Sequence, residues 1–402
     1  EPDKDRDGYY SIGGGPLAGT DCDDTNRYIY PGVATKTGCS GSEARVCQTD
    51  GTWSACSSGG YCPAGCTTCK YIDPVGGNNS NSGTFASPWL NAAMFNNYYA
   101  GGEPGGYLAP TAGTCFIYRT GTIAYEHTYN TDKAGIFLRN RTGGTLANPI
   151  RIMCYPGETC TLDMPTTGAH PFIALDSNYV YFSGFTVTGN TCSGMNGLIT
   201  DHGCVALYGG TGNRAFNNVV YNNTGTTANN TAGLYMHSCT NCSIDHNLSY
   251  DNIGNISDSQ NNSNILAYRG LGNNISDNVT YYTTRNQNVN IKAPKHTNFA
   301  SDYTIRRNTW WNGQFQSGAR NLVIQNNISH EGEVFLGDLG GPAFAGDLTI
   351  ENNTFLNAGL GRIDPTKAYN SNDTAAADQC SGTYTIGTVS YKHLTLTTKL
   401  RV

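Results

Sequence analysis

The stretch Ile244-Asp-His-Asn247-Leu recurs along the chain and decides the fold. Each copy has an apolar residue, one or two other residues, an Asn and the start of a second strand-like segment. The further copies are Phe216-Asn-Asn218-Val-Val, Ile275-Ser-Asp-Asn278-Val, Ile305-Arg-Arg-Asn308-Thr, Ile324-Gln-Asn-Asn327-Ile and Ile350-Glu-Asn-Asn353-Thr. The copies lie about 19 to 33 residues apart, which is the length of one coil of a solenoid.

One such unit cannot bury its apolar face alone, but stacked units share a continuous interior of Val, Ile, Leu and Phe. Asn at matched corners accepts left-handed backbone geometry and stacks its amides into a ladder. The Leu spacing of leucine-rich repeats and the longer blades of propellers are absent from the sequence. The repeats therefore predict an all-β chain forming a right-handed parallel β-helix.

The repeats resemble those of the pectate-lyase-like superfamily over about residues 71–375. The resemblance implies an extracellular protein that acts on a polysaccharide. We expect the β-helix itself to span residues 71–388 and residues 389–402 to form an atypical tail. Because the open end of a solenoid exposes its core, it needs a cap. Ser87 before Pro88, with helical apolar spacing after it, predicts a short N-terminal capping helix.

The amino-acid composition limits the classes of molecule that the chain is expected to bind. Only 13% of residues are charged, the formal net charge is -6, and no basic run with interleaved aromatics appears, so nucleic acid is not expected as a partner. No apolar stretch approaches the roughly 20 residues that span a bilayer. An extracellular polysaccharide is the expected partner, the expected location is secreted or at the cell surface, and the oligomeric state is left open.

The chain has 15 cysteines, which indicates an oxidising compartment, and residues 36–70 read as a Cys-rich connector stapled by disulfides. Zinc is the alternative, because Cys62, Cys66 and Cys69 have tolerable ligand spacing. No further pair or His follows at finger distance, so disulfides are favoured. The odd total leaves at least one thiol unpaired or bonded to another chain.

Residues 1–35 form an Asp-rich module in which alternating aspartates precede Gly8. Such spacing directs several hard oxygens at one Ca²⁺ ion. The expected ligands are Asp3, Asp5, Asp7, Asp21, Asp23 and Asp24. The twelfth loop position is Gly14 and not the Glu of an EF-hand. The segment resembles calcium-binding repeats of thrombospondin type 3 style, which implies a metal-stiffened spacer without catalysis.

A second pattern recurs in Val205-Ala-Leu-Tyr208, Leu234-Tyr-Met-His237, Leu266-Ala-Tyr-Arg269 and Val289-Asn-Ile-Lys292. The expected inward residues are Leu207, Met236, Tyr268 and Ile291. Alternation along a strand then places outward Tyr208, His237, Arg269 and Lys292. Coils about 4.8 Å apart would bring these four into one aromatic and cationic row that fits a uronate chain.

A lyase that cleaves uronates by β-elimination must neutralise the carboxylate, remove the alpha proton and protonate the departing oxygen. Lys292 is the predicted base, since cationic neighbours disfavour its charged form. Arg269 and His237 are predicted to bind the carboxylate. The predicted substrate-binding residues are Tyr208, Tyr235, Asn288, Asn290, Lys295 and His296.

The resemblance implies a base Lys at a strand end preceded by acidic calcium ligands. Here the preceding run Arg285-Asn-Gln-Asn-Val-Asn-Ile has no Asp or Glu, so an active-site Ca²⁺ could be held only by groups such as Asn288 and Asn290. This departure speaks against a calcium-assisted mechanism.

Two other functions stay open. A glycoside hydrolase needs converging carboxylates, for which the candidates are Asp201 beside His202, Glu331, Glu333 and Asp338. The polygalacturonase pattern is not present. The second alternative is a non-catalytic surface or matrix protein that binds carbohydrate through its many tyrosines or forms extracellular assemblies.

Overall fold

The structure is a computed structural model, and the residues it describes fall into the following segments. They are 22–23, 34–35, 45–47, 52–53, 60–63, 65–95, 109–124, 127–129, 132–164, 169–192, 202–225, 231–254, 262–283, 289–292, 300–317, 321–331, 334–336, 348–356, 360–363, 384–386 and 390–392.

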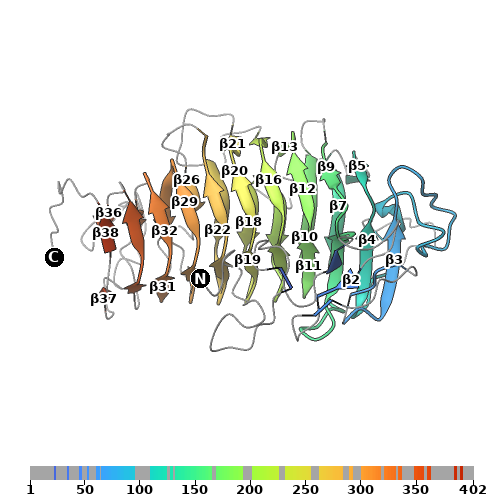
Figure 1. Cartoon of the computed structure of the whole chain (residues 1–402), viewed down its shortest axis with the longest axis horizontal. Helices are drawn as coiled ribbons and strands as arrows, with labels where there is room; N and C mark the ends of the chain where they lie inside the picture. The colour runs from blue at the N-terminus through green and yellow to red at the C-terminus, as the bar shows by residue number, and fades with distance from the viewer. Residues whose placement is uncertain are drawn as a thin grey trace.

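Three long sheets run the length of the body, and their strands lie across its long axis, coil after coil (Figure 1). Apart from β6 and β7, which pair antiparallel, the neighbouring strands of these sheets are parallel. In a typical coil the chain passes from a strand of sheet 1 to one of sheet 2 and then to one of sheet 3. The predicted parallel β-helix is confirmed.

Sheet 1 contains β6 (His127–Tyr129), β7 (Asp132–Arg139), β10 (Ala169–Leu175), β14 (His202–Tyr208), β18 (Thr231–His237), β22 (Asn262–Tyr268), β26 (Val289–Lys292), β30 (Gln314–Ser317), β33 (Val334–Leu336) and β36 (Leu360–Ile363). Sheet 2 contains β3 (Thr68–Ile72), β4 (Thr114–Tyr118), β8 (Ile150–Cys154), β11 (Val180–Ser183), β15 (Arg214–Phe216), β19 (Ser243–Asp245), β24 (Asn274–Ser276), β28 (Thr304–Arg306), β31 (Leu322–Gln325), β34 (Leu348–Glu351) and β37 (Tyr384–Ile386).

Sheet 3 contains β5 (Gly121–Ile123), β9 (Cys160–Leu162), β12 (Phe185–Thr188), β16 (Val219–Tyr221), β20 (Leu248–Tyr250), β25 (Val279–Tyr281), β29 (Thr309–Trp311), β32 (Ile328–His330), β35 (Thr354–Leu356) and β38 (Ser390–Lys392). Small sheets are formed by β13 (Thr191–Cys192), β17 (Thr224–Gly225) and β21 (Ile253–Gly254), by β23 (Gly270–Leu271) and β27 (Ala300–Ser301), and by β1 (Ala34–Thr35) and β2 (Arg45–Val46).

The interior is built from rows of apolar side chains that stack from coil to coil. The central row of sheet 2 follows the recurring Ile of the sequence, except that the first copy contributes Ala215 and not the expected Phe216, which pairs with Asp245 in the outer row. The row contains Ala215, Ile244, Ile275, Ile305, Ile324 and Ile350. All of them are buried in one core cluster with inward residues of sheets 1 and 3. Each repeat therefore contributes one layer to a common core, as the repeat spacing predicts.

The predicted Asn ladder is present at the corner between sheets 2 and 3. Its members are Asn218, Asn247, Asn278, Asn308, Asn327 and Asn353, and each Nδ2 except the last donates to the Oδ1 of the next at 2.9–3.1 Å. The left-handed backbone falls on the preceding residues instead, such as His246 with φ 56° and Asp277 with φ 60°. One residue makes the turn, and the next carries the buried amide.

The N-terminal end of the core is covered differently from the predicted capping helix. The described segment has one turn of 3-10 helix, η1 (Ala92–Met94), which is capped by the side chain of Asn91 and not by Ser87. Trp89 cannot join a helix because its backbone N–H donates to the Tyr71 carbonyl in a bridge beside β3. The ring of Phe95 stacks on Phe116 at 3.8 Å, so this segment still covers the core.

The expectation of disulfides is confirmed for the described cysteines. The bridges are Cys22–Cys47, Cys62–Cys69, Cys66–Cys115, Cys154–Cys160, Cys192–Cys204 and Cys239–Cys242. They indicate an oxidising compartment. Cys39, Cys56 and Cys380 lie outside the described residues.

Two strands lie beyond the expected bounds of the β-helix. β3 begins at Thr68, three residues before the expected start, and β38 lies within the expected tail, where it pairs with β35 in sheet 3. Among the residues that the structure describes, no helix has the length and apolar character needed to cross a membrane.

Candidate functional site

Part of the predicted outer row exists on sheet 1. Tyr208 pairs with His237, and His237 pairs with Tyr268. The His237 ring is stacked between the two tyrosines, with centroids 4.4 Å from Tyr208 and 5.3 Å from Tyr268. Only 5% of His237 is exposed, so the stack leaves little of its imidazole to meet a ligand.

The register corrects the predicted positions of Arg269 and Lys292. β22 aligns Ile265 with Leu234, so Tyr268 takes the outer position beside His237 and Arg269 follows the strand at a corner with φ 58°. The core requires this register, since a one-residue slip would reverse the two faces of the strand. The Arg269 guanidinium lies 5.6 Å from the Tyr268 ring centroid, at the edge of the stack.

Lys292 pairs with Leu266 and Gln316, in the row next to that of His237. The same row contains Tyr235, which is fully buried in an outer apolar cluster with Phe137 and other residues and is therefore closed to a substrate. The four predicted residues thus do not form one row.

Other predicted site residues cannot be placed. Asn288, Lys295 and His296 lie outside the described residues, as do Asp3, Asp5, Asp7, Asp21 and Asp24 of the acidic module and the carboxylates Asp201, Glu333 and Asp338. Asn290 and Lys292 are described by backbone only. Asp23 is half-buried next to Cys22, and Glu331 is half-buried at a left-handed corner.

A pocket of about 440 Å³ lies on the outer face of sheet 2, away from the predicted row. It extends over β11, β15, β19, β24 and β28, which are adjacent strands and therefore span about 19 Å along the axis. Charged groups gather there although few residues of the chain are charged: Arg214, Asp245, His246, Asp277, Arg306 and Arg307.

Asp245 is the centre of this pocket. Its Oδ1 accepts hydrogen bonds from Arg214 Nε at 2.8 Å and Ser243 Oγ at 2.9 Å, and its Oδ2 accepts from Arg214 Nη2. His246 Nδ1 lies 2.9 Å from the same Oδ2. Burial alone would raise the pKa of Asp245, but the charge and hydrogen bonds of Arg214, with those of His246, hold that pKa well below its usual range. The carboxylate is therefore ionised and orients the imidazole.

A second buried carboxylate lies one coil further along. Asp277 accepts from Arg307 Nε at 2.6 Å and Nη2 at 2.8 Å, a bidentate pair like that of Asp245 and Arg214. Arg306 differs from both paired arginines. It is exposed, and its guanidinium makes no hydrogen bond or ion pair with the other residues that the structure describes. Arg306 is thus the cation of the pocket best placed to receive an anion.

Local structure explains why these groups converge. His246, Asp277 and Arg307 occupy the left-handed corner on three successive coils, immediately before the ladder asparagines. Arg306 follows Asp245 and Ser276 in the outer row of sheet 2. The variable residues inside each Asn repeat are the sequence signal for this cluster, because they supply its charged side chains.

The tyrosines of the pocket add neutral donors at its N-terminal side. Burial raises the pKa of Tyr181 more than Arg214 and Arg151 lower it, so its hydroxyl stays protonated. Tyr179 lines the pocket beside it from a left-handed corner. A phenolic O–H can donate to a sugar hydroxyl or a carboxylate.

An aromatic ladder lies on the outer face of sheet 3. Tyr221, Tyr250, Tyr281 and Trp311 stack with centroids 4.5–4.8 Å apart and planes within 5° of parallel. Each inner ring has both faces covered by its neighbours. The ladder therefore presents ring edges, which do not provide the flat platform that sugar stacking uses.

The pocket has the chemistry of an anion-binding site with a proton acceptor. Three guanidinium groups face two carboxylates, and His246 is oriented by a buried anion. Both carboxylates receive bidentate guanidinium pairs. Because the pKa of Asp245 is lowered, Asp245 is not suited to serve as the protonated acid of a glycoside hydrolase.

Comparison with known proteins does not assign this chain to a family. No protein-family model matches the sequence, and no curated protein matches it either. Pectate lyase Pel9A is 15% identical, with a TM-score of 0.45 over 82% of this chain and 80% of that chain.

A rhamnogalacturonan lyase is 16% identical, with a TM-score of 0.44 over 73% of this chain and 74% of that chain. The GH136 lacto-N-biosidase from Eubacterium ramulus is 12% identical, with a TM-score of 0.36 over 81% of this chain and 68% of that chain. At such identities and TM-scores, these likenesses do not identify a reaction, which has to be argued from the residues of this chain.

Proposed function

We propose that this chain is an extracellular protein that binds an acidic, uronate-containing polysaccharide on the outer face of sheet 2 and cleaves it by β-elimination. The observation that carries the proposal is one pocket that holds both the Asp245–His246 pair and the exposed Arg306. Its extent of about 19 Å along the axis accommodates several sugar units of an extended polymer.

Each of these residues has a separate role in the proposed reaction. Arg306 binds the uronate carboxylate and neutralises its charge, which makes the alpha proton removable. His246, oriented by Asp245, accepts that proton through Nε2. The carbon–carbon double bond forms as the bond to the leaving oxygen breaks, and water protonates the departing oxygen.

The residues predicted from sequence form a competing site for the same reaction. Lys292 remains a candidate base, with Arg269 to bind the carboxylate, near the outer face of sheet 1. We rank this set second because His237 is buried in its stack and because Lys292 lies in a different row from His237.

Carbohydrate binding without cleavage is the second candidate function. It is supported by the exposed Arg306, which can bind an anion even if no proton is transferred. The Asp-rich module would then serve as a Ca²⁺-stiffened spacer, a proposal that rests on sequence because five of its six aspartates lie outside the described residues.

The test is incubation with pectate, alginate and a glycosaminoglycan. A lyase generates an unsaturated product that absorbs in the ultraviolet. New reducing ends without that chromophore would indicate hydrolysis, and retention on immobilised polymer without either product would indicate a binder. With activity present, His246→Gln and Arg306→Ala should abolish or strongly reduce it. Loss on Lys292→Ala alone would move the reaction to sheet 1 and overturn the proposed site.

A further inference from the structure

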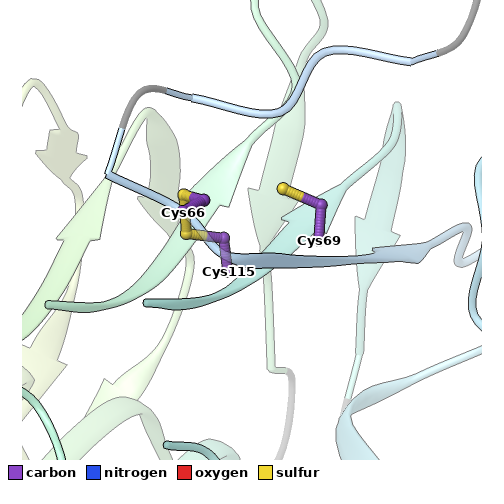
Figure 2. A group of neighbouring side chains, drawn as sticks. All are labelled: Cys66, Cys69 and Cys115. Carbon is purple, nitrogen blue, oxygen red and sulfur yellow. A yellow bond between two sulfur atoms is a disulfide. The ribbon is translucent and has the colours of Figure 1, made fainter. Parts of the chain in front are cut away.

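Four cysteines meet where the connector joins the first coil of the β-helix. β3 and β4 are adjacent strands of sheet 2, and Cys69 is the register partner of Cys115. The Cys66–Cys115 bridge lies beside Cys69, as Figure 2 shows, and Cys69 is itself bonded to Cys62. Two disulfides therefore lie side by side.

Three of the four sulfur atoms are spaced for a metal site as well as for disulfide bridges. Those of Cys66, Cys69 and Cys115 lie within 4.8 Å of one another, and the Cys62 sulfur is bonded to that of Cys69. In a tetrahedral zinc–thiolate site, Zn–S bonds of about 2.3 Å place the sulfurs roughly 3.8 Å apart. The Cys62 sulfur is not part of this close group, so it has to move towards the sulfurs of Cys66 and Cys115 to complete the site.

We propose that, when the two bridges are reduced, Cys62, Cys66, Cys69 and Cys115 bind one Zn²⁺ ion as a tetrathiolate site. A dithiol or phosphine reductant supplies the four electrons that convert the two disulfides to four thiols. The thiols then release four protons as their sulfurs bind the metal. The tertiary fold supplies Cys115 as the fourth ligand, which lies too far along the chain to be recognised as part of a zinc motif.

The backbone around the cluster supports the site without the bridges. The N–H groups of Thr67 and Thr68 donate to the Gly113 carbonyl at 2.8 and 3.2 Å, which fixes the loop between Cys66 and Cys69 against the start of β4. Together with the pairing of β3 and β4, these bonds keep the ligands near one another after reduction. A pre-formed site lowers the entropic cost of binding a metal.

The site is buried on one side and open to solvent on the other. Cys115 is fully buried and Cys69 packs against an aromatic cluster that includes Tyr71 and Tyr155, whereas Cys62 is exposed. A reductant and then a metal ion can approach from the side of Cys62. The first coil would then stay fastened to the connector under both oxidising and reducing conditions.

The test uses the full chain, reduced with a phosphine in the presence or absence of Zn²⁺ and then alkylated. Mass spectrometry of peptides should show that Zn²⁺ protects Cys62, Cys66, Cys69 and Cys115. The matched control is Cys154–Cys160, another short-range bridge near the same end, which should stay reactive. Metal analysis should give one zinc per chain, and Co²⁺ should give the absorption bands of a tetrahedral thiolate site.

A paired variant separates this site from other thiols. Cys62→Ser/Cys69→Ser should lose zinc and the cobalt bands, while Cys154→Ser/Cys160→Ser should keep both. The proposal is overturned if Zn²⁺ protects no cysteine, if it protects the control pair equally, or if the first variant keeps its zinc. A reduced chain that unfolds and shows no selective protection also counts against it.

Discussion

His246 Nδ1 lies 2.9 Å from Asp245 Oδ2, although neighbouring residues in a regular strand point to opposite faces. The left-handed backbone at His246, with φ 56°, ends the strand and brings the imidazole beside the preceding carboxylate. The corner that turns the chain from sheet 2 to sheet 3 thus also forms the acid–base pair of the pocket.

Replacement of Asp245 by Asn should lower the rate of uronate cleavage roughly 100-fold or more, because the imidazole loses the anion that orients it and stabilises its protonated form. The measurement is the initial rate of chromophore formation. Asp277→Asn is the matched control, since Asp277 accepts a similar bidentate pair of hydrogen bonds from Arg307. Equal losses in the two variants would argue against the histidine pair.

The stability of the fold should depend on Asp245 at acid pH. Its pKa is lowered in the folded chain, so its ionised form stabilises the fold above the unfolded-state pKa of about 3.9. That contribution is lost as the pH falls from there towards the folded-state pKa. The melting temperature of the wild type should therefore fall more steeply below pH ~4 than that of Asp245→Asn. Parallel curves between pH 7 and pH 3 would contradict this assignment.

Removal of one amide from the Asn ladder should destabilise the whole stack. Asn278 Nδ2 donates to the Ile244 carbonyl, and its Oδ1 accepts from the backbone N–H of Asn247 at 3.0 Å. Asn278→Ala leaves these buried groups unpaired, at a cost of about 2–5 kcal/mol. Chemical denaturation measures the loss. Asn222→Gly at an exposed corner with φ 57° should cost under about 1 kcal/mol, and a similar loss in both variants would refute the ladder's role.

His237→Phe tests whether this residue serves packing or chemistry. Phe keeps the aromatic stack between Tyr208 and Tyr268, so the variant should fold with a stability change within about 1 kcal/mol and keep its activity. His237→Ala should lose about 2 kcal/mol through the missing ring contacts. Loss of activity in a stably folded His237→Phe protein would instead support the row predicted from sequence.

The sequence predicts the β-helix because every coil has the same local packing requirement, and this requirement produces the Asn repeat. A buried amide such as that of Asn247 or Asn278 and an inward apolar residue before it are required in each layer of the ladder, so both recur at matched positions. The outer row of sheet 1 has no such packing requirement. The sequence pattern aligns Leu266-Ala-Tyr-Arg269 with Leu234-Tyr-Met-His237. In the structure, however, Leu234 pairs with Ile265, so Arg269 lies beyond the end of the strand.

What the sequence by itself determined is the stack, because stacking depends on periodic apolar and amide positions that repeat within a few tens of residues. What only the tertiary structure decided is which outward residues become neighbours. A register shift of two residues keeps the same face of a strand inward but changes every neighbour on the surface. For that reason Arg306 shares a pocket with Asp245 and His246, and Cys115 lies beside Cys66 and Cys69, through contacts that no local sequence pattern predicts.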